Sequence, residues 1–183
     1  MIDRAVLVAP GASATRDHPS LLAIEAALAP LDVPVARIDL PSRKATAVVV
    51  GMVREAAAAL AVRTGLAPTR IVLGGRSFGG RMCSMAVAEG LPALGLVLVS
   101  YPLHPPGRPE KARTEHLPLL SVPCLFVSGT RDSFATRAEL EAATTAIPGP
   151  VTHVWIEGGD HGLRGRDRDV AADVRDWVVG LPG

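Results

Sequence analysis

The chain has 183 residues, and its 19 basic and 18 acidic side chains leave a formal net charge of +1. A balance this even, with arginines scattered along the chain, argues against a nucleic-acid-binding surface. No apolar run is long enough to cross a membrane, and the first residues lack the basic start and cleavage site of a secretory signal, so we expect a single soluble domain over residues 1–183.

Short apolar runs alternate with helix-like runs along the whole chain. The predicted strands cover residues 5–9, 33–40, 70–73, 95–100, 122–128 and 151–156. The predicted helices cover residues 19–29, 47–63, 79–89, 136–146 and 167–179. Strands that alternate with helices favour a parallel sheet covered on both faces. We therefore expect a three-layer α/β/α sandwich around a mostly parallel, six-stranded sheet.

The most specific motif lies between the third predicted strand and the helix that follows it. The residues there are Gly75, Arg76, Ser77, Phe78 and Gly79, a G-x-S-x-G sequence. At a strand-to-helix turn this pattern is typical of a nucleophile elbow, which exposes the serine hydroxyl at the carboxyl edge of the sheet. A purely structural turn and a phosphate-binding loop are the alternatives, and no Lys-Ser or Lys-Thr follows the glycines to support the second. We interpret Ser77 as a nucleophile.

Two more polar residues follow later strands in the order that a serine nucleophile requires. Asp132 comes after the fifth predicted strand and His161 after the sixth, so we expect both to meet Ser77 at one edge of the sheet. A serine hydroxyl needs a base to remove its proton. His161 would be that base, and Asp132 would orient its imidazole. Asp160, adjacent to His161, is the alternative acid, but we expect it to shape the loop.

Four segments together resemble the small, lidless α/β-hydrolases related to dienelactone hydrolases. They are GGRSFGGR at 74–81, YPLHPPG at 101–107, FVSGTRD at 126–132 and GGDH at 158–161. The resemblance covers nearly the whole chain and implies a trimmed α/β-hydrolase fold that lacks the two N-terminal strands. It also implies that Ser77, Asp132 and His161 are the catalytic triad of a serine hydrolase. Such an enzyme would cleave a small ester, thioester or related acyl substrate through an acyl-enzyme. A catalytically silent binding or scaffold module is the alternative, because a fold does not fix a function.

The oxyanion hole of such an enzyme needs two backbone N–H groups aimed at the developing charge. We expect one from Phe78 and the other from Ala12, or alternatively from Ser13, in the loop after the first strand. Pro10 and Gly11 stand where relatives commonly carry His-Gly. Proline removes a backbone donor, and this departure is the sequence feature that favours the silent module.

The segment 101–117 is rich in proline and charge, and we expect it to border the pocket because larger relatives insert a lid there. The candidate substrate-binding residues are Ser13, Tyr101 and His104. As histidines of a polar loop, His104 and His116 are otherwise expected to be solvated. The expected partner is a small-molecule acyl substrate, with no nucleic acid and no membrane, and the protein is expected to be a monomer or homodimer.

The remaining polar and sulfur-containing side chains have plain interpretations. Arg76 and Arg81 flank the elbow and could bind an anionic substrate group or form ion pairs. Cys83 and Cys124 are typical of small buried hydrophobes. Two cysteines do not make a disulfide framework, so we expect the reducing cytoplasm. No His, Cys, Asp and Glu set has metal-ligand spacing, so we expect no metal and no cofactor.

Overall fold

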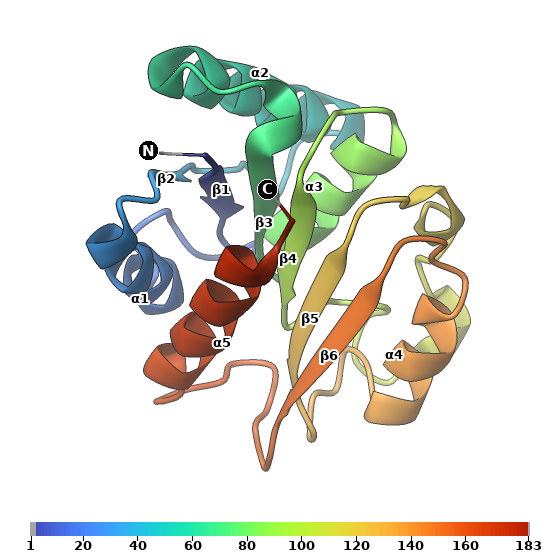
Figure 1. Ribbon diagram of the computed structural model, residues 1–183. Helices are drawn as coiled ribbons and strands as arrows, with labels where there is room; N and C mark the ends of the chain where they lie inside the picture. The colour runs from blue at the N-terminus through green and yellow to red at the C-terminus, as the bar shows by residue number, and fades with distance from the viewer. Residues whose placement is uncertain (1–2, 183) are drawn as a thin grey trace.

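A computed structural model describes residues 3–182 and contains a six-stranded sheet in the order β2-β1-β3-β4-β5-β6 (Figure 1). Every neighbouring pair of strands is parallel. This confirms the predicted six-stranded α/β architecture, with a sheet that is wholly rather than mostly parallel. The strands are β1 (Ala5–Ala9), β2 (Val35–Arg37), β3 (Ile71–Arg76), β4 (Gly95–Val99), β5 (Cys124–Gly129) and β6 (Val151–Ile156).

Helices cover both faces of the sheet (Figure 1). Side chains alternate between the two faces of a strand, so Val6 and Val8 of β1 join one apolar cluster while Leu7 joins the other. Because all three are fully buried, the strand reads as a continuous apolar run. The Val6 cluster includes α1 (Pro19–Leu28) and α5 (Asp167–Gly180). The Leu7 cluster includes α2 (Thr46–Thr64), α3 (Phe78–Ala88) and α4 (Arg137–Thr144).

Two strands differ most from their predicted bounds. The strand predicted over 33–40 is reduced to β2, which lies at the sheet edge and pairs only with β1. The strand predicted to end at Leu73 continues to Arg76, because Gly74 and Gly75 pair with both neighbouring strands. A Cβ at Gly75 would lie 2.0 Å from the Ala9 carbonyl oxygen, and its φ of 148° disfavours other residues. Glycine here permits close strand packing, whereas the sequence suggested an early turn.

Arg4 joins the beginning of the chain to its last helix. Its side chain is almost fully buried, and Nη1 donates to the carbonyl oxygens of Val178 at 2.7 Å and Leu181 at 3.0 Å. The last carbonyls of a helix lack the usual i+4 donor, so the guanidinium supplies donors at the end of α5, where the Val178 carbonyl also accepts the Leu181 N–H at 3.4 Å. Asp3 completes the arrangement with an ion pair to Nη2 at 2.7 Å.

The segment between β4 and β5 is held to α3 by a buried network of hydrogen bonds. The hydroxyls of Ser84 and Tyr101 lie 3.1 Å apart, and His116 Nε2 lies 2.9 Å from the first and 2.8 Å from the second. Ser84 and Tyr101 are buried, and His116 is half-buried. The expectation of solvated histidines is wrong for this segment. His104 is only 4% exposed, and its ring nitrogens contact the Pro105 carbonyl and Glu139.

The free energy of unfolding should fall as the pH drops from about 7 to about 5, in part because of His116. Burial, assisted by the charge of Arg81, lowers the pKa of His116 to about 4. In the unfolded chain the pKa returns to roughly 6.5, so the unfolded state binds the proton first and gains stability. Urea denaturation at both pH values measures the fall, and His116→Gln should make it smaller.

His104→Gln is the matched control because the pKa of His104 is shifted in the opposite direction to that of His116. Burial disfavours the charged form of His104, but the Pro105 carbonyl and Glu139 outweigh burial and raise its pKa. Such a group stabilises the fold at low pH and loses that contribution as the pH rises through its folded-state pKa. Removing it should enlarge the fall between pH 7 and pH 5. Equal falls in the wild type and both variants would contradict both assignments.

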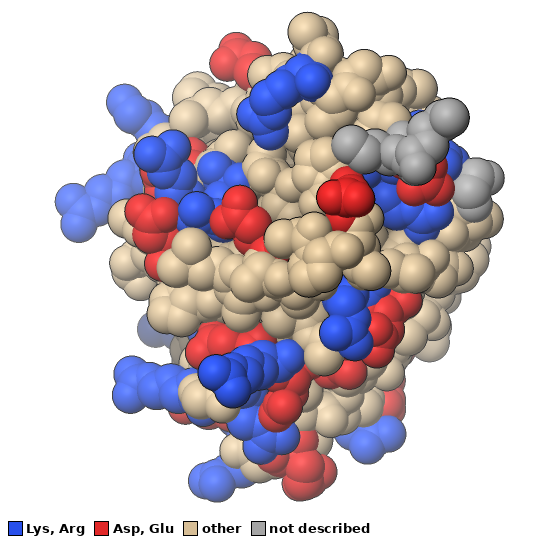
Figure 2. Space-filling model, turned by 60° about the vertical axis from the view of Figure 1, so that its left-hand side comes forward, with Lys and Arg blue, Asp and Glu red and all other residues tan. Residues whose placement is uncertain are grey.

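The surface carries both signs of charge. On the face seen in Figure 2, acidic and basic side chains are interspersed among uncharged residues. Within residues 3–182, no helix has the length and apolar character needed to cross a membrane.

Candidate active site

Ser77 occupies a strained turn between β3 and α3. Its φ of 49° and ψ of −117° are unusual for a residue other than glycine, and such a conformation costs roughly 1–3 kcal/mol. The surroundings hold it in place, since Ser77 N donates to the Val99 carbonyl at 2.8 Å. At Gly79 a Cβ would lie 2.4 Å from the Ala9 carbonyl oxygen, so α3 can begin this close to β1 only with glycine there. The motif therefore folds as the predicted strand-to-helix elbow.

The three predicted triad residues meet at the carboxyl edge of the sheet. Ser77 Oγ lies 2.9 Å from His161 Nε2, in the loop after β6. His161 Nδ1 lies 2.9 Å and 3.0 Å from the two carboxylate oxygens of Asp132, in the loop after β5. A carboxylate only accepts hydrogen bonds, so Nδ1 carries the proton and Nε2 is free to accept from the serine hydroxyl. The Asp132 side chain is 1% exposed and that of His161 18% exposed. The arrangement can draw a proton from the serine.

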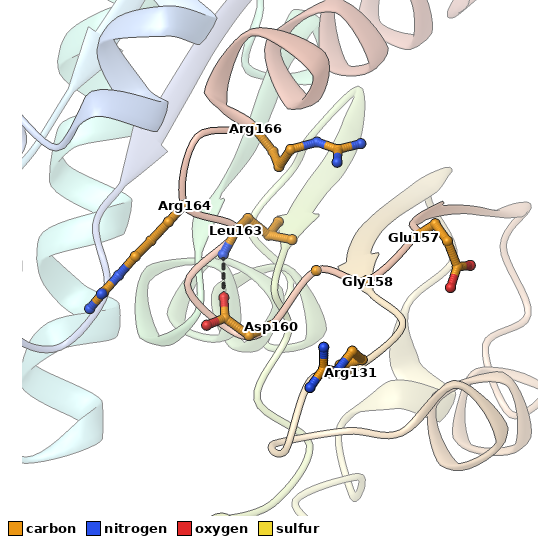
Figure 3. Close-up of a pocket in the computed structure, with 8 residues that line it drawn as sticks. Arg131, Glu157, Gly158, Asp160, Leu163, Arg164 and Arg166 are labelled. Carbon is orange, nitrogen blue, oxygen red and sulfur yellow. Dashed lines mark hydrogen bonds between the residues drawn. The ribbon is translucent and has the colours of Figure 1, made fainter.

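Asp160 has the loop-shaping position expected for it. Its Oδ1 accepts the Leu163 N–H at 3.0 Å (Figure 3), whereas Asp132 makes the hydrogen bonds to His161. A hollow of about 370 Å³ lies beside this loop, and the arginines around it project in different directions. Neither Ser77 nor His161 lines it. Its lining residues are Arg131, Glu157, Gly158, Gly159, Asp160, Leu163, Arg164 and Arg166.

Two residues make contacts with His161 that the sequence did not predict. The ring of Phe134 stacks on the imidazole with centroids 3.9 Å apart and planes 23° apart. Phe134 N also donates to Asp132 Oδ1 at 2.8 Å. Arg76 Nη2 donates to the His161 carbonyl oxygen at 2.6 Å. Neither predicted role of Arg76, anion binding or ion pairing, includes this bond. Phe134 lies two residues after Asp132, and Arg76 directly precedes Ser77. This nearness in the sequence was the signal that could have placed both residues in the site.

One expected oxyanion donor, Phe78, directly follows Ser77, and the other, Ala12, belongs to a loop that approaches it. Phe78 is the first residue of α3, so its N–H has no acceptor within the helix. The loop after β1 also approaches the nucleophile, since a Cβ at Gly11 would lie 3.7 Å from Ser77 Cβ. Ala12 is exposed in this loop, and its carbonyl accepts the Ser42 hydroxyl at 2.7 Å.

The three candidate substrate-binding residues lie in different environments. Ser13 is exposed in the loop after β1. Tyr101 is 1% exposed and His104 is 4% exposed, and the polar atoms of both contact protein groups. Neither therefore has a free polar group to offer a substrate. Among the described residues, no group of three His, Cys, Asp or Glu side chains is placed to hold a metal ion.

Solved structures resemble this chain in fold over nearly its whole length. The crystal structure of a dienelactone hydrolase from Anabaena variabilis superposes with a TM-score of 0.80 and 19% identity, covering 100% of this chain and 88% of that one. Est1E from Butyrivibrio proteoclasticus gives a TM-score of 0.75 and 15% identity, covering 98% and 88%.

Epoxide hydrolase A of Mycobacterium tuberculosis is 36% identical over 63 residues, which are 34% of this chain and 20% of that protein. The matched part is thus about a fifth of this relative's length. The family described as "Alpha/beta hydrolase domain" matches residues 2–177. The chain belongs to the α/β hydrolase family.

Proposed function

We propose that the protein is a serine hydrolase that cleaves a small ester, thioester or related acyl compound through an acyl-enzyme. Membership of the α/β hydrolase family supports hydrolase activity. The observation that carries the finer proposal is the chain of hydrogen bonds from Ser77 Oγ to His161 Nε2 and from Nδ1 to Asp132. Covalent labelling of Ser77 by a fluorophosphonate is the direct test, because the reagent reacts with an activated serine.

The proposed reaction has two halves that use the same proton carrier. His161 Nε2 takes the proton of Ser77 Oγ as Oγ bonds to the carbonyl carbon, and the carbonyl π electrons move to the oxygen. The double bond then re-forms, and the leaving group departs with the proton held by His161. Water next gives a proton to His161 and bonds to the acyl carbon, and Ser77 Oγ leaves with that proton. Asp132 stabilises the imidazolium of both halves.

The oxyanion of each half would be held by the N–H groups of Phe78 and Ala12. Phe78 directly follows Ser77 and the loop that carries Ala12 approaches it, and preorganised donors at such positions are worth about 10²–10³ in kcat in comparable enzymes. Pro10 precedes Gly11 in place of the common His-Gly pair, which is the argument for a silent scaffold. A silent scaffold would give no covalent adduct, so the labelling experiment separates the two functions.

Esters of short acids, such as acetate and butyrate, should be hydrolysed in preference to long-chain esters. The segment 101–117, which could form a lid, places Tyr101, Leu103 and Leu117 in the hydrophobic core, so these side chains are not free to line an acyl tunnel. An open site buries few methylenes, each worth about 0.8 kcal/mol. The measurement is kcat/KM for p-nitrophenyl esters of increasing length. A steady rise beyond about eight carbons, near that increment per methylene, would reveal a deep tunnel.

We also propose a cytoplasmic monomer or homodimer that acts on a small molecule and binds neither nucleic acid nor membrane. Cys83 and Cys124 are both free and buried, in keeping with a reducing compartment. The interspersed charges of Figure 2 offer no basic stripe on the visible face. Sedimentation analysis measures the oligomeric state.

A further inference from the structure

Arg76 connects two loops of the candidate active site although it is the immediate neighbour of Ser77 at the end of β3. Its Nη2 donates to the backbone carbonyl of His161 at 2.6 Å. Its Nη1 lies 3.5 Å from where a Cβ would stand on Gly11, so the guanidinium also lies against the loop that carries Ala12. One side chain therefore contacts both the loop of the proposed base and the loop of the proposed oxyanion donor.

The charge of Arg76 does not explain this placement by itself. The carboxylates of Asp132, Asp160 and Asp167 attract the guanidinium, and its charge disfavours protonation of His18. Among residues 3–182, however, no carboxylate forms an ion pair with Arg76 within 4.0 Å. Burial lowers the pKa of Arg76 despite these carboxylates. The half-buried guanidinium is directed instead at a neutral carbonyl. Arginine suits such a task because its planar fork holds several donors in fixed directions.

We infer that Arg76 is a positioning residue that holds the backbone of His161 where Nε2 can form its hydrogen bond with Ser77 Oγ; this inference rests on the proposed function. The imidazole is already fixed at its edge by Asp132 and at its face by Phe134. Those contacts orient the ring, and Arg131 N holds the Gly159 carbonyl of the same loop at 2.8 Å, but none of them binds the backbone of His161 itself. The bond from Arg76 ties that backbone to the residue next to the nucleophile. A displacement of about 1 Å in such a site costs on the order of 10²-fold in rate.

The test is the comparison of Arg76→Met with Arg76→Lys. Arg76→Met keeps much of the apolar stem and removes every donor, so kcat should fall by about 10²-fold while KM stays within a few-fold of the wild type. The rate of fluorophosphonate labelling should fall in parallel. Arg76→Lys restores one donor and should recover part of kcat. Hydrogen exchange, which needs no turnover, should become faster across residues 158–165 in Arg76→Met.

Arg54→Met is the matched control. Arg54 also donates from Nη2 to a backbone carbonyl, that of Glu89 at 2.9 Å, but it lies on α2. Its loss should leave kcat and exchange in the His161 loop unchanged. Equal kcat in Arg76→Met and the wild type would overturn the inference. So would a rise in KM at constant kcat, which would make Arg76 a substrate contact. If wild-type Ser77 is not labelled, the proposed function fails, and the exchange experiment alone decides the positioning role.

Discussion

Ser77→Ala should eliminate the fluorophosphonate adduct and lower kcat by about 10⁶-fold, the size of the loss when a serine protease loses its nucleophile. The expected reason is local. Ser77 Oγ is the atom within 2.9 Å of His161 Nε2, and the partly exposed hydroxyl contributes little to packing. The variant should therefore unfold at nearly the wild-type temperature. Mass spectrometry of the labelled protein locates the adduct, and a p-nitrophenyl acetate assay gives kcat.

Ser133→Ala provides the control for this experiment. Ser133 is an exposed serine next to Asp132 that makes no contact in the proposed reaction. The Ser133→Ala variant should keep the adduct on Ser77 and most of the activity. Labelling of the folded wild type anywhere except Ser77, or no labelling at all, would sink the enzyme proposal in favour of the silent module.

Asp132→Asn should lower kcat by about 10⁴-fold, the loss known when the carboxylate of another triad becomes an amide. An amide can donate to Nδ1, which leaves the proton on Nε2, where it cannot accept from Ser77. Burial strengthens the effect, because the Asp132 side chain is 1% exposed and water cannot replace the lost carboxylate. The fold should survive, since the amide retains an oxygen that can accept the Phe134 N–H.

Asp160→Asn makes the same chemical change one residue from His161. Its Oδ1 accepts the Leu163 N–H, and an asparagine oxygen can do the same. We expect kcat within about ten-fold of the wild type, since no transition-state interaction is removed. The two variants are compared in one kcat measurement with thermal melts alongside. A larger loss from Asp160→Asn than from Asp132→Asn would reverse the assignment of the acid.

The elements whose signal lies in consecutive residues of the sequence were predicted correctly. The runs that became β1 and β6 match their predicted bounds. In β1 every residue is buried, and a strand buried on both faces is apolar throughout. The elbow was equally readable, since its glycines and serine are consecutive. The end of β3 was misjudged because Gly74 and Gly75 resemble a turn when the neighbouring strands are not considered.

Contacts between distant parts of the chain could not be predicted. Arg76 and the His161 carbonyl are 85 positions apart, and nothing in either neighbourhood specifies the bond. The same is true of His116, which lies 32 positions from Ser84, so a proline-rich loop was assumed to be solvated. The stacking of Phe134 on His161 depends on how two loops meet at the edge of the sheet. Such pairings follow from topology, which is assembled from all the strands together.

The contacts of Arg4 with the end of α5 impose an order on biosynthesis. Arg4 is synthesised well before its carbonyl partners in Val178 and Leu181, which lie 174 and 177 positions later in the chain. Until they emerge, burying the guanidinium would leave Nη1 unpaired, which is costly, because Asp3 pairs only with Nε and Nη2. β1 should therefore stay incompletely packed in the nascent chain until α5 has been synthesised, and before that point its exposed apolar side chains most need chaperones.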